Sequence, residues 1–231
     1  MKKILILAVL TLFAAQASQA QTAYTEKRQV SGFDEVSFAV SGEALITLGK
    51  EFRVELEGDK DYIDEIITEV VGGELRIKRE KWFDTGNKKV IVRITMPALD
   101  GISVSGSGSV KVNDPLRGDE LDVAISGSGK AFIRDVELGE VGCAISGSGS
   151  LNVTGKGTIK KLEISISGSG DYQGETTGIG VLEARISGSG SCDCYVTEML
   201  RASISGSGSV LYSGNPKIDA AVSGSGKVRM K

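Results

Sequence analysis

Ser167-Gly168-Ser169-Gly170 is one of seven copies of the same four residues in this chain. The copies begin at Ser105, Ser126, Ser146, Ser167, Ser187, Ser205 and Ser223, at intervals of 21, 20, 21, 20, 18 and 18 residues. A near-constant period of about 20 residues is typical of a solenoid, in which one small unit is stacked many times and contacts only its neighbours. The repeat therefore predicts the architecture, and it says little about activity.

Apolar residues alternate with polar or small residues on both sides of each motif. In the copy at Ser167, Ile164 and Ile166 precede the motif and Tyr172 follows it at the same spacing of two. This period is that of a β-strand with one buried face. The motif serines then point outward and the glycines inward. We expect an inward glycine either to form a corner or to leave room for a large side chain across the core.

Strands that recur every 20 residues without a helical pattern between them predict an all-β coil, with turns about 4.8 Å apart. The handedness of parallel crossover connections favours a right-handed coil. We therefore expect a right-handed single-stranded parallel β-helix, regular over residues 101–231 and less regular over residues 24–100. The alternative is an antiparallel meander of hairpins, which would not stack like side chains into ladders.

An imperfect eighth copy is found at Ser41-Gly42-Glu43-Ala44, with Ala44 in place of the second glycine. The 64 residues from Ser41 to Ser105 correspond to about three coils of this period. The residues from Asp59 to Val70 have the apolar spacing of one short helix, with Asp59 or Asp61 as a possible N-cap. Strand-like runs flank this segment, at residues 52–57, 75–79 and 90–95.

Residues 1–20 have the pattern of a secretory signal peptide. Lys2 and Lys3 precede the apolar run from Ile4 to Ala15, and Ser18-Gln19-Ala20 fits the small-x-small cleavage pattern. We expect cleavage after Ala20 and a single mature domain over residues 21–231, without a second apolar segment of membrane length. The mature protein would then be periplasmic, extracellular or on the cell surface.

Composition excludes several classes of function. With 27 basic and 30 acidic residues the net charge is −3, which argues against a nucleic-acid partner. The chain has no histidine, so histidine-based catalytic triads and metal sites are excluded. Cys143, Cys192 and Cys194 occupy inward positions, and we interpret them as small core residues rather than as disulfide or metal ligands. We expect no metal and no cofactor.

The strongest candidates for acid catalysis are Glu163 and Glu183. They occupy the same outward position in adjacent coils, and Arg201 follows in the next coil. Two stacked carboxylates can raise the pKa of one of them, as a polysaccharide lyase or hydrolase would require. We favour the interpretation that these residues form a solvated charge ladder, and we predict no catalytic residues.

The candidate binding surface is instead the two rows of motif serines. Their hydroxyls can bind a glycan or an envelope protein, or they can satisfy one another by hydrogen bonds along the ladder. The candidate residues are Ser105, Ser107, Ser126, Ser128, Ser146, Ser148, Ser167, Ser169, Ser187, Ser189, Ser205, Ser207, Ser223 and Ser225.

Three further stretches accompany the repeat: Arg28-Gln29-Val30-Ser31-Gly32-Phe33-Asp34-Glu35-Val36, Gly73-Glu74-Leu75-Arg76-Ile77, and Val90-Ile91-Val92-Arg93-Ile94-Thr95-Met96-Pro97-Ala98-Leu99. With the Ser-Gly-Ser-Gly ladder they resemble the "putative auto-transporter adhesin, head GIN domain" family of secreted Bacteroidota proteins. The resemblance covers nearly the whole mature chain. It implies a right-handed β-helix similar to the pectate-lyase-like class, and it carries over no catalytic residues.

The leading hypothesis is an exported, non-enzymatic β-solenoid that acts as an adhesin or envelope-binding protein. One alternative is a polysaccharide lyase or hydrolase on the same fold, for which acidic residues would have to converge in one groove. The other is a purely structural spacer, which would show no saturable binding to cells or glycans.

Overall fold

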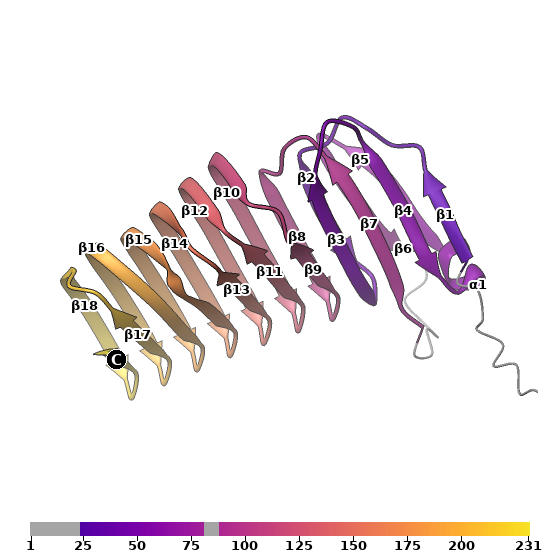
Figure 1. Cartoon of the computed structure of the whole chain (residues 1–231). Helices are drawn as coiled ribbons and strands as arrows, with labels where there is room; N and C mark the ends of the chain where they lie inside the picture. Colours follow the sequence, from indigo (N-terminus) through magenta and orange to yellow (C-terminus); the bar gives the residue numbers. More distant parts are fainter. Residues whose placement is uncertain (1–23, 81–87) are drawn as a thin grey trace, which may run out of the picture.

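The structure is a computed structural model that describes residues 24–80 and 88–231. The expected signal peptide and its cleavage site after Ala20 lie outside the described residues. The described chain is a long stack of β-strand turns, with an N-terminal segment folded over one end (Figure 1). No helix among the described residues is long and apolar enough to cross a bilayer.

Parallel strands build the regular part of the stack. The first serine of each motif pairs with its counterpart in the next turn, from Ser105 opposite Ser126 to Ser205 opposite Ser223. This register confirms the β-solenoid and rules out the meander. The strands are β8 (Gly101–Gly106), β9 (Ser109–Val112), β10 (Leu116–Gly127), β11 (Lys130–Arg134), β12 (Val136–Gly147), β13 (Ser150–Thr154), β14 (Gly157–Gly168), β15 (Asp171–Gly188), β16 (Ser191–Gly206), β17 (Ser209–Ser213), β18 (Lys217–Gly224) and β19 (Lys227–Met230).

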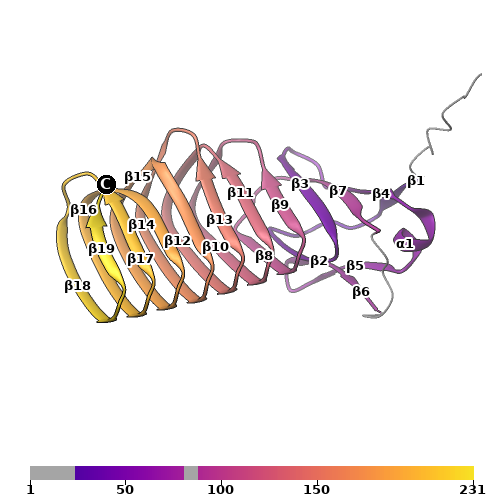
Figure 2. The ribbon, with the colours of Figure 1, turned by 90° about the horizontal axis from the view of Figure 1, so that it is seen from below.

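The motif lies at the corner where one strand of a turn ends and the next begins. Figure 1 shows these corners as a row of narrow tips along the lower edge, and Figure 2 shows the same turns from below, stacked one behind another. The inward side chains form one continuous hydrophobic core from Phe33 to Val210, in which Tyr172 is fully buried. Burial of one face of every strand is what the alternating pattern predicts.

The two glycines of each motif have different structural roles, as Gly168 and Gly170 illustrate. Gly168 has a φ of +117°, and a Cβ there would lie 2.6 Å from the carbonyl oxygen of Gly147 in the preceding turn. Gly170 is buried, and a Cβ there would lie 2.4 Å from Cγ2 of Ile145. The first glycine therefore forms the corner and does not face inward as expected. The second does, and its neighbour belongs to the preceding turn rather than to the far side of the core.

Backbone hydrogen bonds between turns continue through the corner. The amide of the second motif serine donates to the carbonyl of the first glycine in the preceding turn, at 2.8 Å for Ser128, Ser148, Ser169, Ser189 and Ser207. The residue after the motif then donates to the second glycine of the preceding turn; Asp171 donates to Gly149 at 3.0 Å. Because the corner keeps these bonds, the turns stay in register where the chain changes direction.

The N-terminal part is not a run of three coils, as expected from its length. β2 (Glu35–Ala39) and β3 (Gly42–Leu48) pair directly with β8 and β9, so the turn that contains Ser41 adjoins the turn that contains Ser105. The pairing of Ala44 with Val110 also aligns Ser41 with Ser107, two residues from the expected alignment. A shift of two residues preserves the inward and outward positions, so the alternation alone could not detect it.

The segment between β3 and β8 folds back onto the other side of this turn. β6 (Glu74–Arg79) and β7 (Val90–Met96) pair in parallel with β2 and β3, respectively. β4 (Arg53–Gly58) is antiparallel to both β7 and β1 (Tyr24–Arg28), and β5 (Ile66–Val71) is antiparallel to β6. The expected strands are therefore present, and the antiparallel ones cover the N-terminal end of the stack (Figure 2).

The helix α1 (Lys60–Asp64) is shorter than expected. Asp59 is its N-cap, as one of the two predicted candidates, and its Oδ1 accepts a hydrogen bond from the Tyr62 amide at 3.0 Å. The apolar residues after Asp64 belong instead to β5. That strand is rich in β-branched side chains, which favour a strand when a partner such as β6 is available.

The corner geometry predicts which glycines can be replaced. We expect Gly168→Ala to lower the free energy of unfolding by about 1–3 kcal/mol, because the new Cβ meets a backbone oxygen and the φ disfavours any side chain. Gly118→Ala is the matched control, since a Cβ there meets only Leu138 Cδ2 at 3.8 Å. Urea unfolding of both variants tests this. Equal stabilities would contradict the assigned role of Gly168.

Candidate functional site

The motif serines lie along one edge of the solenoid. The first serine of each motif is the next-to-last residue of a strand, and the second lies in the corner between that strand and the next. All are exposed except Ser105, which is half-buried. The predicted outward orientation is confirmed. The first glycine, which has a positive φ, lies between the two serines of each motif.

The hydroxyls of the motif serines make no hydrogen bond with other described residues. Within residues 24–80 and 88–231, no motif-serine side chain forms a hydrogen bond with another protein group, so the predicted serine-to-serine bonds are absent. Each hydroxyl is both a donor and an acceptor, and its neighbours recur at the spacing of adjacent strands, about 4.8 Å. The edge therefore offers a regular series of free polar groups, held by a backbone that is fixed at every corner.

Glu163 and Glu183 are adjacent, as predicted, at paired positions of β14 and β15. Neither is a free carboxylate. Lys161 contacts Glu163, and Arg201 Nη1 lies 2.9 Å from Glu183 Oε1. The hydrogen bond from Lys161 holds the pKa of Glu163 below its ordinary value. Stacking against Glu183 therefore does not raise the pKa of Glu163, and a lowered pKa disfavours Glu163 as a general acid.

Lys161 also connects Glu163 to a third carboxylate, Glu140. Its Nζ lies 2.8 Å from Glu140 Oε1 in the preceding turn, so it links Glu140 and Glu163. Hydrogen bonds to these two carboxylates raise the pKa of Lys161, which keeps it charged. Lys161 and Arg201 therefore neutralise the stacked Glu163 and Glu183, as expected of a solvated charge ladder.

The three cysteines are buried and form no disulfide, which confirms their interpretation as core residues. Burial raises the pKa of the Cys143 thiol to about 12. A hydrogen bond with Cys194, together with burial, raises the pKa of Cys192 well above its ordinary value. In the part of the chain that the structure describes, no three Asp, Glu or Cys side chains are grouped so that they could hold a metal ion.

We expect these thiols to be inert in the native protein, because the thiolate is the reactive form. A maleimide should label none of them at pH 8 and all three after denaturation, as mass spectrometry can show. The raised pKa of Cys143 also has a stability consequence. The contribution of Cys143 to the free energy of unfolding should be constant below about pH 9 and fall as the pH rises toward 12, because there the thiol ionises only in the unfolded chain.

Rapid labelling of the native protein would contradict this assignment. The variant Cys143→Ala is the control for the pH dependence, since it removes the titrating group. Its free energy of unfolding should fall less steeply above pH 9 than that of the parent protein.

Several solved structures have the same fold. A "putative adhesin" from Bacteroides fragilis NCTC 9343 matches with a TM-score of 0.83 and 24% identity, over 92% of this chain and 98% of that chain. A "putative adhesin" from Parabacteroides distasonis ATCC 8503 matches with a TM-score of 0.73 and 22% identity, over 90% and 97%. A "putative lipid binding protein" from the same strain matches with a TM-score of 0.69 and 22% identity, over 92% and 98%.

At these identities the likeness concerns the fold alone, and no curated protein matches the chain. A family model described as "Putative auto-transporter adhesin, head GIN domain" matches residues 32–216. The matched range begins before β2, ends after β17 and contains six of the seven motifs. The chain therefore belongs to the head GIN domain family of putative auto-transporter adhesins.

Proposed function

We propose that the mature chain is a non-enzymatic adhesin of the cell envelope or cell surface, and that it binds a glycan through the motif serines. The observation that carries the proposal is the row of exposed hydroxyls that make no hydrogen bond within the described protein. Membership of an adhesin family supports it. The pairing of Glu163 and Glu183 with cations supports binding over acid catalysis.

The geometry favours a polymer over a small ligand. An exposed hydroxyl that exchanges water for a ligand group gains only about 1 kcal/mol, so one serine binds weakly. Successive turns present the same group in register, and linked weak contacts add as intramolecular events. The corner hydrogen bonds fix the backbone that carries the hydroxyls before binding, which reduces the entropy lost on association.

Export is part of the proposal. The composition of residues 1–20 supports a cleaved signal peptide, with a mature chain from Gln21 that functions in the periplasm or outside the cell. An envelope protein with exposed amides is a second kind of partner that the same hydroxyl row would suit, and a binding screen separates it from a glycan.

The serine row can be removed without disturbing the fold. The variant Ser148→Ala, Ser169→Ala, Ser189→Ala loses three tip hydroxyls, and we expect its affinity for a bound glycan to fall roughly tenfold to a hundredfold. Stability should change by less than about 0.5 kcal/mol, because these side chains are exposed. The measurement is a glycan array on the mature chain, followed by titration of the best glycan.

The matched control is Thr154→Ala, Thr158→Ala, Thr176→Ala, which removes three exposed hydroxyls of β13, β14 and β15 outside the motifs. It should bind like the parent protein. If the serine variant and the threonine variant bound the glycan equally well, the serine row would not be the contact surface.

A further inference from the structure

A cleft of about 770 Å³ lies where the serine row meets the N-terminal part. Its walls are residues 41–43, 57–58, 88–91 and 107–109, with Lys130 from the next turn. The register of β3 and β9 makes Ser41 the counterpart of Ser107. The cleft therefore lies on the line of corner tips, at the N-terminal end of the serine row.

The carboxylates that line this cleft are already neutralised. Glu43 Oε1 lies 2.6 Å from Lys111 Nζ, and Glu57 Oε2 lies 2.7 Å from Arg93 Nη2. Neither carboxylate is left to repel an anion or to attract a cation. The charge of the cleft is therefore set by its lysines.

Two of the three lining lysines have no carboxylate partner among the described residues. Lys88 Nζ lies 2.9 Å from Asp59 Oδ1, but Lys89 and Lys130 form no ion pair with any residue of the described ranges 24–80 and 88–231. Both are exposed. Lys89 precedes β7 and Lys130 begins β11, so they come from separate turns and line one hollow.

Hydroxyls accompany these cations. The side chains of Ser41 and Ser107 form no hydrogen bond within the described residues, although both line the cleft. An ammonium group binds a carboxylate or a sulfate ester by charge-assisted hydrogen bonds, while a serine hydroxyl pairs with a neutral hydroxyl. Free cations next to free hydroxyls fit a ligand that carries both an acidic group and sugar hydroxyls.

We infer that this cleft binds the acidic group of an anionic oligosaccharide, a uronate or a sulfated sugar, whose next units continue along the serine row. The inference rests on the proposed glycan binding and names the class of sugar. A phosphate or a lipid headgroup shares the anionic group, but it would leave the adjoining hydroxyl row without a partner.

The test is isothermal titration of the mature chain with four probes: trigalacturonate, a heparin-derived tetrasaccharide, neutral maltotetraose and inorganic phosphate. At least one acidic oligosaccharide should bind more tightly than phosphate. The variant Lys89→Gln, Lys130→Gln should weaken that binding about tenfold or more and reduce its salt dependence. Any binding of maltotetraose should be unchanged.

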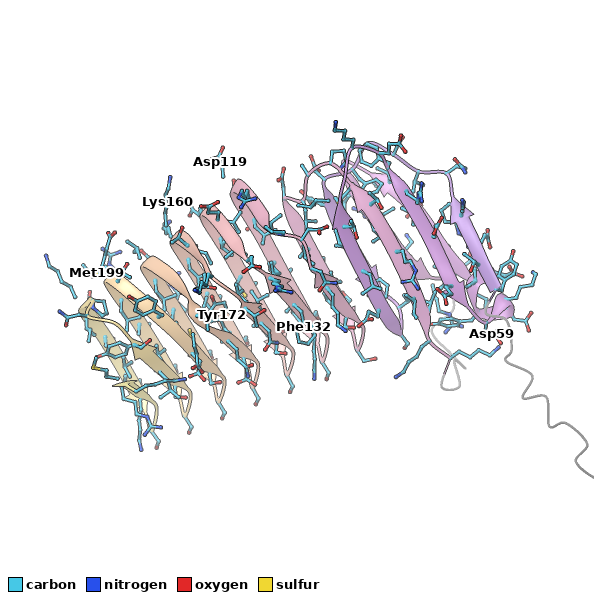
Figure 3. All side chains as sticks on the ribbon, viewed as in Figure 1. Asp59, Asp119, Phe132, Lys160, Tyr172 and Met199 are labelled. Atoms are coloured by element: carbon cyan, nitrogen blue, oxygen red, sulfur yellow. The ribbon has the colours of Figure 1, made fainter. Side chains whose placement is uncertain are left out.

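The matched control is Lys156→Gln, Lys160→Gln, which removes the same charge from two exposed lysines outside the cleft. Figure 3 shows Lys160 on the edge opposite the corner tips. The control should bind like the parent protein. A separate experiment measures binding of the protein to phosphatidylcholine vesicles with and without phosphatidylglycerol. We expect the protein to bind both kinds of vesicle weakly and to the same extent.

Three results would overturn the inference: no binding of either acidic oligosaccharide, equal loss in the two lysine variants, or tighter binding of phosphate or anionic vesicles than of the sugars. These results leave the proposed function intact if the serine variant still loses affinity for a neutral glycan. Conversely, acidic sugars could require Lys89 and Lys130 but not the tip serines. That result would support binding in the cleft and would contradict the proposal that the serine row binds glycans.

Discussion

The fold depends on a contact that only glycine permits at the corner of each turn. The carbonyl of Gly147 accepts a hydrogen bond from the Ser169 amide at 2.8 Å, and a Cβ on Gly168 would lie 2.6 Å from the same oxygen. Without a glycine there, the turns must move apart or lose this bond. Because the bond holds each turn against the last, the strands stay in register and the alternating residues fill one core.

The motif thus divides structure and function between its residues. The glycines are required where they are by close packing between turns, whereas the motif serines make no side-chain hydrogen bond within the described part of the chain. A polar group that is repeated at a structural corner without serving the structure is available for an external partner. The Glu163 and Glu183 ladder shows the opposite case, since its charges are satisfied within the protein and offer a ligand little.

The sequence alone was sufficient for the solenoid, its period and the exposure of the serines, because these follow from local alternation and a fixed repeat. The sequence was insufficient for features that depend on which distant segments of the chain come into contact. The alignment of Ser41 was wrong by two residues because alternation cannot detect such a shift. The helix prediction ran past Asp64 because β5 gains a partner in β6. The cleft was missed because Lys89 and Lys130 converge only after the segment between β3 and β8 folds back.

Native-state hydrogen exchange at the corners tests most directly whether hydrogen bonds to the glycine carbonyls hold adjacent turns together. The amides of Ser128, Ser148, Ser169, Ser189 and Ser207 belong to exposed residues, yet each donates to a glycine carbonyl in the preceding turn. We expect these amides to exchange as slowly as those of the adjoining strands, since they open only when the stack opens. Exchange at the rate of an unstructured chain would show that the corners are not hydrogen-bonded, and it would contradict the role of these bonds in holding the turns in register.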